Sequence, residues 1–423
     1  MKFQPNIITS WNGYSKNLFL KDVLAGISVG VIALPLSMAF AIASGLTPAV
    51  GIFTAIISSI CISMFGGCKV QIGGPAGAFI VIVYGILHKY GLPSLLISTA
   101  LSGFLLFFMG VFGLGKFIRL IPQSVINGFT SGIAVLILLS QLKEFLGLTI
   151  QLPVDFFGIV QEVYLHFQEF DSPTLLMSVF CLMFLFFWRQ VRKYLGFFSG
   201  FPEILVVLGL STAAVMCFHL PLETIGHKYG SIPDHFPEFV SPTFDLHVIF
   251  YLIVPIVTLT ILGAIESLLC ARVADGLTHD SHDPDQELMG QGIANFLLPF
   301  FGGMPATGTI ARTVSNIKSG ASSPVSGIVH AFTLFIIVYF LGYLAKEIPI
   351  SCLAAILIYV ALNMGDWNKL IRFKQFQVSD RIAMFSVFVL TVIFNLAVSI
   401  TFGIGLVIWN HYYKKWKFKQ DVS

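Results

Sequence analysis

Apolar segments recur along almost the whole chain, and they restrict the possible folds more than any other feature. A membrane-spanning helix needs about 20 consecutive apolar residues. Hydrophobic residues make up 56% of the chain and charged residues 11%, whereas soluble domains carry about 25% charged residues. The sequence therefore predicts an all-α polytopic membrane protein and excludes a soluble enzyme, a disordered scaffold and a disulfide-built secreted domain. The candidate spans lie near 24–44, 49–65, 75–88, 93–114, 124–142, 174–188, 203–219, 247–273, 290–301, 307–317, 324–344, 349–364, 380–396 and 398–412.

Composition also argues against several kinds of ligand. The six cysteines are scattered without a CxxC pair, so neither a zinc site nor a redox motif is expected. The net charge of +3 and the lack of a basic stretch interleaved with aromatic residues argue against nucleic acid. The run 279–285 contains histidine and aspartate, and we interpret it as a solvated connecting loop. No catalytic residue, cofactor or metal is expected, and the protein is not predicted to be an enzyme.

Lysines concentrate at both ends of the chain, and cytoplasmic segments of membrane proteins carry such an excess. Both termini are therefore predicted to be cytoplasmic, which requires an even number of spans, as fourteen is. We read no signal peptide in residues 1–18, and we expect a multi-pass protein of the inner membrane. The lysines concerned are Lys2, Lys16, Lys21, Lys414, Lys415, Lys417 and Lys419.

Two short matches indicate an internal duplication. Ala-Ser-Gly-Leu at 43–46 matches Ala-Asp-Gly-Leu at 274–277, and Gly-Gly-Pro-Ala at 73–76 matches Gly-Met-Pro-Ala at 303–306. The two offsets agree to within one residue. Because each half would hold seven spans, the halves would be inverted relative to each other, as in many secondary transporters. We therefore predict one transporter unit over 1–423, with repeats at about 15–219 and 245–412.

The segments 75–88 and 307–317 are too short to cross a bilayer, so each is predicted to begin near its middle. The first backbone N–H groups of a helix lack intrahelical partners, and the helix dipole places a partial positive charge there. Two such N-termini facing each other form an anion site. The alternative is that the small Gly and Pro residues only permit close helix packing.

Two charged residues in apolar surroundings are candidates for function. Glu266 lies inside an apolar run, where an ionisable group costs several kcal/mol by insertion scales. A carboxyl group that takes and loses a proton there can couple proton movement to transport; the alternative is a neutral structural glutamate. Arg312 lies five residues inside the second short segment and offers five fixed donors to an oxyanion. Its alternatives are pairing with Glu266 or a snorkelling position at the helix end.

Several motifs resemble the SulP (sulfate permease) family of anion transporters. They are the segments 22–30, 34–40, 74–79, 264–269, 283–295 and 301–316. The resemblance covers essentially the whole chain in order. It implies a uracil-permease-like fold of seven plus seven inverted spans, with a core domain that rocks against a gate domain.

The resemblance also implies a location for the anion, between the third and tenth spans and lined by the first and eighth. By the same resemblance, Phe40 would form an aromatic wall of this site, with Arg312 nearby. Leu36 stands where many members have a polar residue, and Ala76 stands where some bicarbonate carriers have threonine, so the site depends more on helix dipoles. The implied substrate-binding residues are Phe40, Pro75, Ala76, Gly77, Gly308, Thr309, Ile310, Ala311 and Arg312.

The resemblance implies a secondary active carrier of small oxyanions, sulfate or bicarbonate. Sodium-coupled members place Asp and Thr where this chain has Glu266 and Cys270, so proton symport is favoured over sodium. The alternatives are a sodium-coupled bicarbonate or C4-dicarboxylate carrier and an uncoupled anion exchanger or channel. Most members continue into a cytosolic STAS domain; here we expect the membrane unit alone and, at most, a weak homodimer. A separate STAS or carbonic anhydrase partner is left open.

Overall fold

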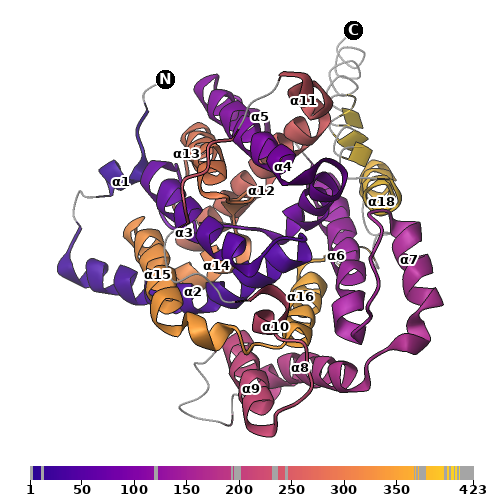
Figure 1. The fold of residues 1–423 in the computed structure, drawn as a ribbon. Coiled ribbons are helices and arrows are strands. Elements are labelled where there is room, and N and C mark those ends of the chain that lie inside the picture. Colours follow the sequence, from indigo (N-terminus) through magenta and orange to yellow (C-terminus); the bar gives the residue numbers. More distant parts are fainter. Residues whose placement is uncertain are drawn as a thin grey trace.

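The computed structural model consists almost entirely of helices (Figure 1). It describes residues 3–10, 14–118, 122–191, 194, 202–230, 237–242, 246–365, 367, 370, 378–394, 398–399, 402–403, 405–406 and 409. The longer helices are α2 (Lys16–Ala43), α3 (Pro48–Phe65), α4 (Ile80–Val111), α6 (Gln123–Leu146), α8 (Ser172–Val191), α9 (Glu203–Phe218), α12 (Ile253–Thr278), α13 (Pro284–Leu297), α15 (Val325–Ala345), α16 (Ile350–Met364) and α18 (Val378–Ile393). The shorter elements are α1 (Asn6–Thr9), α5 (Gly115–Ile118), α7 (Phe156–Leu165), α10 (Ile225–Tyr229), α11 (Leu246–Tyr251), α14 (Ile310–Lys318), the 3-10 turns η1 (Gly77–Phe79), η2 (Phe167–Glu169) and η5 (Leu298–Phe301), and the strands β1 (Gly73–Gly74) and β2 (Thr307–Gly308).

The expected fold class, an all-α polytopic membrane protein, is confirmed. Within the described residues, five helices are long and apolar enough to cross a membrane by length and composition. One of them runs from Gly77 to Val111 and covers two predicted spans. Gly91, with φ 80° and ψ 173°, breaks it at the predicted boundary, in a conformation that glycine adopts readily. The last predicted span, 398–412, lies largely outside the described residues.

Local sequence explains where several helices begin. Ser15 precedes α2, and its hydroxyl accepts a hydrogen bond from the backbone N–H of Leu18. Asp283 caps α13 in the same way, accepting from the amides of Asp285 and Gln286. Pro284 occupies the first position of α13, where its missing N–H costs nothing. The Asp283 cap ends the connecting loop that the sequence predicts at 279–285.

The helices pack into two groups. In the first, α4 packs against α12 and α13, and α2 packs against α3 and α15. In the second, α6 packs against α16 and α18, and α8 packs against α9 and α16. Figure 1 shows α6, α7 and α18 on one side of the molecule and α1, α3, α13 and α15 on the other. The first group corresponds to the expected core domain and the second to the expected gate domain.

Small residues bring the helices of the core together. An ideal Cβ atom on Gly26 of α2 would lie 2.5 Å from the carbonyl oxygen of Ser326 in α15. One on Gly30, a turn later, would lie 2.8 Å from Cβ of Thr333. Helices in lipid lack a hydrophobic force that drives their association, so close backbone approach through small residues contributes much of their packing energy.

We expect Gly51→Ala to destabilise the protein measurably. A Cβ atom on Gly51 of α3 would lie 2.0 Å from the carbonyl oxygen of Ser37 in α2. Overpacking of this kind costs about 1–3 kcal/mol. Gly209 of α9 has nothing within 4 Å of its ideal Cβ, so Gly209→Ala is the matched control. The melting temperature in detergent should fall for the first variant only; equal melting temperatures would contradict the packing described.

The strands β1 and β2 meet at the centre of the core. They pair antiparallel, with Gly73 opposite Gly308 and Gly74 opposite Thr307. Each strand leads into a helix start, the first into η1 and α4 and the second into α14. This antiparallel meeting is the arrangement that an inverted repeat predicts. The strands do not occupy matching positions in the two repeats, however. The sequence match aligns Pro75 with Pro305, but Pro75 follows β1 whereas Pro305 precedes β2.

Candidate functional site

Hydrogen bonds tie the first turn of α14 to the segment before β1. The amide and hydroxyl groups of Thr309 both donate to the carbonyl oxygen of Ile72, at 2.9 and 3.1 Å. The amide of Ile72 in turn donates to Oγ1 of Thr313 at 3.0 Å. These bonds link residues far apart in the sequence, so the start of α14 has a fixed position relative to β1.

The first turn of α14 has backbone amides that make no hydrogen bond within the helix. The amide of Thr313 closes the first helical turn on the carbonyl oxygen of Thr309, at 2.9 Å. The amides of Ile310, Ala311 and Arg312 precede that bond, so they are the ones that a ligand could bind. Ile310 is half-buried and Ala311 is exposed, whereas Arg312 is buried. The approach to this helix end therefore passes over Ala311.

The other helix start is lined by an aromatic ring. Pro75, Ala76 and Gly77 are buried where β1 gives way to η1. An ideal Cβ atom on Gly77 would lie 3.4 Å from Cε1 of Phe40 and 3.2 Å from Cδ1 of Ile137. The structure thus places Phe40 against the first helix start, and it adds Ile137 of α6 to the same wall.

Gly308 and Thr309 both contact the segment that precedes β1. An ideal Cβ atom on Gly308 would lie 1.7 Å from Nε2 of Gln71, so the Gln71 side chain fills the space beside this glycine. The Thr309 amide already bonds to Ile72. The Thr309 amide is therefore used within the protein, whereas the amides of Ile310, Ala311 and Arg312 precede the first closed turn; that Gly308 and Thr309 contact the anion stays a prediction.

The guanidinium group of Arg312 packs against Gly74 of β1. Its side chain is 2% exposed, and Nη2 donates to Oγ of Ser37 at 3.0 Å. Its Nη1 lies against Gly74, where an ideal Cβ atom would be 2.0 Å away, and has no hydrogen-bond partner among the described residues. Among those residues no carboxylate pairs with Arg312, so the alternative of an ion pair with Glu266 is not seen. An uncompensated guanidinium attracts an anion strongly in a site of low dielectric constant.

Glu266 lies on the face of α12 that contacts the second short segment. Gly263, three residues earlier, accepts a hydrogen bond at its carbonyl oxygen from Thr307 Oγ1 at 3.2 Å. Cys270, four residues later, donates from Sγ to Thr313 Oγ1 at 3.2 Å. Residues at these spacings share one helix face. Glu266 is half-buried, and within the described part of the chain its carboxyl group has no hydrogen-bond partner.

Three polar residues of this region were missed by the sequence reasoning. Gln71 packs on Gly308, and Thr313 joins Ile72 to Cys270. Asn295 donates to the carbonyl oxygen of Ala306 and accepts from its amide, both at 2.8 Å, which fixes the extended segment before β2. Their one signal in the sequence is a polar side chain next to Gly- and Ala-rich apolar segments.

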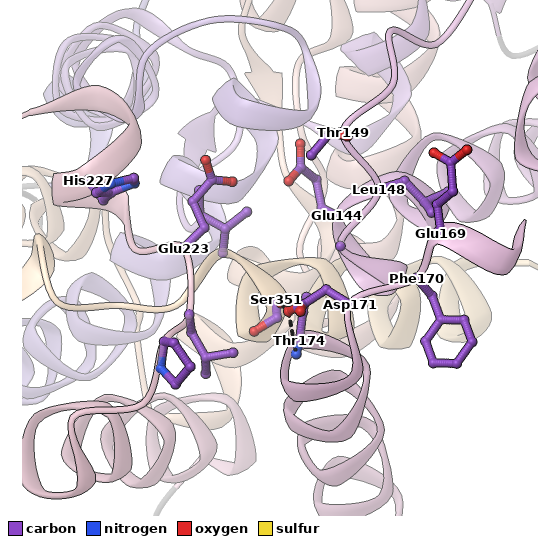
Figure 2. Close-up of a pocket in the computed structure, with 14 residues that line it drawn as sticks. Glu144, Leu148, Thr149, Glu169, Phe170, Asp171, Thr174, Glu223, His227 and Ser351 are labelled. Carbon is purple, nitrogen blue, oxygen red and sulfur yellow. Dashed lines mark hydrogen bonds between the residues drawn. The ribbon is translucent and has the colours of Figure 1, made fainter. Parts of the chain in front are cut away.

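A separate cavity lies in the second helix group (Figure 2). It has a volume of about 760 Å³ and is lined by parts of α6, α8, α10 and α16. Glu144, Glu169, Asp171 and Glu223 give it an acidic lining, which Figure 2 shows around the cavity. Such a lining repels anions, and none of the predicted site residues lies there.

Several of the polar groups around this cavity are already paired. Nζ of Lys228 lies 3.1 Å from Oε1 of Glu144 and 3.1 Å from Oε2 of Glu223. Burial alone lowers the pKa of Lys228, but the two carboxylates outweigh burial and raise that pKa above its ordinary value. Asp171 caps α8 by accepting from the amide and hydroxyl of Thr174. These pairs give Glu144, Glu223 and Asp171 structural roles.

Residues 19–387 match the family model of the sulfate permease family. The chain is 42% identical over 398 residues to the "Putative sulfate transporter YvdB" of Bacillus subtilis (strain 168), covering 94% of this chain and 74% of that protein. It is 29% identical over 398 residues to the bicarbonate transporter BicA of Picosynechococcus sp., covering 92% of this chain and 69% of that protein.

Solved structures share the fold. The transmembrane domain of a cyanobacterial bicarbonate transporter BicA superposes with a TM-score of 0.80 at 27% identity, covering 92% of this chain and 98% of that one. The murine Slc26a9 anion transporter in its inward-facing state gives a TM-score of 0.87 at 18% identity, covering 97% of this chain and 71% of that one.

Proposed function

The chain belongs to the sulfate permease family, whose members are membrane transporters and not enzymes, and we propose that it carries a small oxyanion across the membrane by alternating access. One observation carries the proposal: the start of α14 and the start of η1 meet through the β1–β2 pair beside the buried guanidinium of Arg312. Free amides, helix dipoles and this unpaired cation all favour a negatively charged ligand.

Sulfate and bicarbonate are the proposed substrates. The relatives YvdB and BicA carry the names of a sulfate and a bicarbonate transporter. Ala76 brings no hydroxyl group to the first helix start, so the proposed site there consists of backbone and the Phe40 ring. Such a site is matched to charge more than to a particular hydrogen-bond pattern. A C4-dicarboxylate carrier is the alternative substrate class.

A ligand screen on the purified protein tests the substrate. A ligand that binds the folded state raises the melting temperature. We expect sulfate or bicarbonate to do so, and fumarate and chloride to have less effect. Counterflow in liposomes then separates a carrier from a channel, because only a carrier accelerates labelled uptake when unlabelled substrate is trapped inside. No shift with any of these anions and no counterflow would contradict the proposal.

Proton coupling through Glu266 is the proposed driving mechanism. Glu266 lies on the α12 face whose neighbours Gly263 and Cys270 bond to the second short segment, and its carboxyl group has no hydrogen-bond partner in the described residues, so it is available to bind a proton. The sodium alternative needs hard oxygen ligands. The residue one turn along is Cys270, whose thiol is bound to Thr313, and this favours protons.

The protein is a multi-pass membrane protein, and we propose that it lies in the inner membrane with both termini in the cytoplasm. The lysines at both ends of the sequence support this orientation. Labelling single cysteines placed near residues 5 and 420 of a cysteine-free variant, in intact cells, tests it. Reaction with an impermeant reagent at either position would contradict the orientation.

We expect any homodimer to be weak. Contacts between helices in lipid have no hydrophobic driving force, so a dimer that rests on membrane contacts alone gains little energy. Dilution in detergent should therefore shift the protein from dimer to monomer, as measured by light scattering after size-exclusion chromatography. A dimer that persists on dilution would contradict this expectation.

A further inference from the structure

Glu287 of α13 is a fully buried carboxyl group that only receives hydrogen bonds. Its side chain is 0% exposed. The donors are Gly67 N at 2.9 Å and Cys68 N at 3.1 Å, both to Oε2, and Ser267 Oγ and Gln291 Nε2, both at 3.0 Å to Oε1. A protonated carboxyl group would need an acceptor for its own hydrogen. Four donors therefore fit an ionised carboxylate, which lies in the first turn of α13, where the helix dipole favours it.

The hydrogen bonds continue from Glu287 to the candidate site. The hydroxyl hydrogen of Ser267 is used by Glu287, so Ser267 Oγ acts as the acceptor for Gln71 Nε2 at 3.1 Å. This fixes which end of the Gln71 amide faces α12. The other end, Oε1, is buried and has no partner among the described residues. The same Gln71 side chain packs against Gly308 of β2.

We propose that Glu287, Ser267 and Gln71 form a directional hydrogen-bond relay that positions β2 and the start of α14, and so sets the affinity of the proposed anion site. The inference rests on the proposed function. Glu287 and Ser267 touch neither helix start, so they act as positioning residues through Gln71. The carboxylate determines the direction of the relay, because it forces Ser267 to donate towards α13 and to accept from Gln71.

Because the relay has a direction, it can be tested by exchanging the carboxylate and the amide between positions 287 and 71. In Glu287→Gln, the amide oxygen must face the fixed N–H groups of Gly67 and Cys68, so the amide nitrogen faces Ser267. The Ser267 hydroxyl then donates towards position 71, where the wild type presents an N–H group. In Gln71→Glu alone, the new carboxylate faces the Ser267 hydroxyl group. That group already donates its hydrogen to Glu287, so it has none for the carboxylate at position 71. The two changes together restore the hydrogen bonds between positions 287, 267 and 71 in the opposite direction with the same total charge. Gln291, whose Oε1 has no partner among the described residues, turns its amide so that this oxygen accepts from the new nitrogen at position 287.

The experiment measures sulfate and bicarbonate affinity and ligand-free melting temperature for both single variants and the double variant. We expect each single change to weaken affinity about tenfold or more, as loss of a hydrogen bond to a charged group does. The double variant should recover most of the melting temperature, whereas its affinity stays low because the carboxylate at position 71 lies beside Gly308 at the proposed anion site and repels the anion. Gln286→Ala is the matched control: Gln286 is the adjacent buried residue of α13 and bonds to Phe65 and Gln4, outside the relay.

A purely structural role for Glu287 predicts a different result. The decreases in melting temperature of the two single variants would then add in the double variant, and Gln71→Glu would not rescue Glu287→Gln. That outcome would overturn the inference, as would single variants with wild-type affinity. If a single variant does not fold, Ser267→Ala interrupts the relay without changing charge and should weaken affinity. If the wild type binds neither anion, the proposed function fails, while rescue of the melting temperature still decides whether the relay exists.

Discussion

An Ala311→Leu variant should fold normally and lose anion binding. Ala311 is exposed at the first turn of α14, so a larger side chain there disturbs no packing. It covers the amides of Ile310, Ala311 and Arg312, which precede the first closed turn. Two lost hydrogen bonds to a charged ligand, at about 1.5–3 kcal/mol each, reduce affinity on the order of a hundredfold or more. Titration of sulfate and bicarbonate against the melting temperature measures both binding and folding.

Changes at the two preceding residues separate the backbone site from its surroundings. Thr309→Ala removes a hydroxyl group that donates to Ile72, so it should cost one neutral hydrogen bond, about 1 kcal/mol, mostly in stability. Gly308→Val should abolish binding, because the new side chain displaces Gln71 and moves β2. Equal and mild effects of all three variants would contradict a site built on opposed helix starts.

The membrane fold was predictable because its signals are local. Apolar runs and the Gly- and Pro-containing segments 73–76 before Gly77 and 303–306 before Ile310 are visible in short windows of sequence. The break at Gly91 is likewise marked by glycine followed two residues later by proline. The candidate helix starts could therefore be named without the structure, because a helix too short to span a bilayer must begin inside it.

The contacts that shape the site could not be predicted in the same way. Gln71 fills the space beside Gly308, and Thr309 bonds to Ile72, across more than 200 residues of sequence. The match of residues 73–76 with 303–306 aligns Pro75 with Pro305, but β1 and β2 lie on opposite sides of these two prolines. For Arg312, the residue type alone could not separate an ion pair from a free guanidinium. Only the packing against Gly74 and Ser37 shows which arrangement is present.

Glu266→Gln should abolish uphill uptake while leaving anion binding intact. The substitution keeps nearly the same shape but removes the ability to take and lose a proton, so anion movement is no longer tied to proton movement. Exchange of labelled for unlabelled anion should continue, because exchange needs binding and alternating access only. The measurement is uptake into proteoliposomes under an inward proton gradient. Accumulation above the external concentration should occur for the wild type and fail for the variant.

A second carboxylate provides the control for this prediction. Glu203 lies at the start of α9, where its Oε1 accepts a hydrogen bond from the Tyr359 hydroxyl at 3.3 Å, in the other helix group. Glu203→Gln should retain proton-driven accumulation. Sodium coupling predicts instead that wild-type uptake needs sodium at constant pH and stops when choline replaces it. Because each gradient is imposed separately, wild-type uptake that ignores the proton gradient would refute proton coupling, and so would a Glu266→Gln variant that still concentrates its substrate.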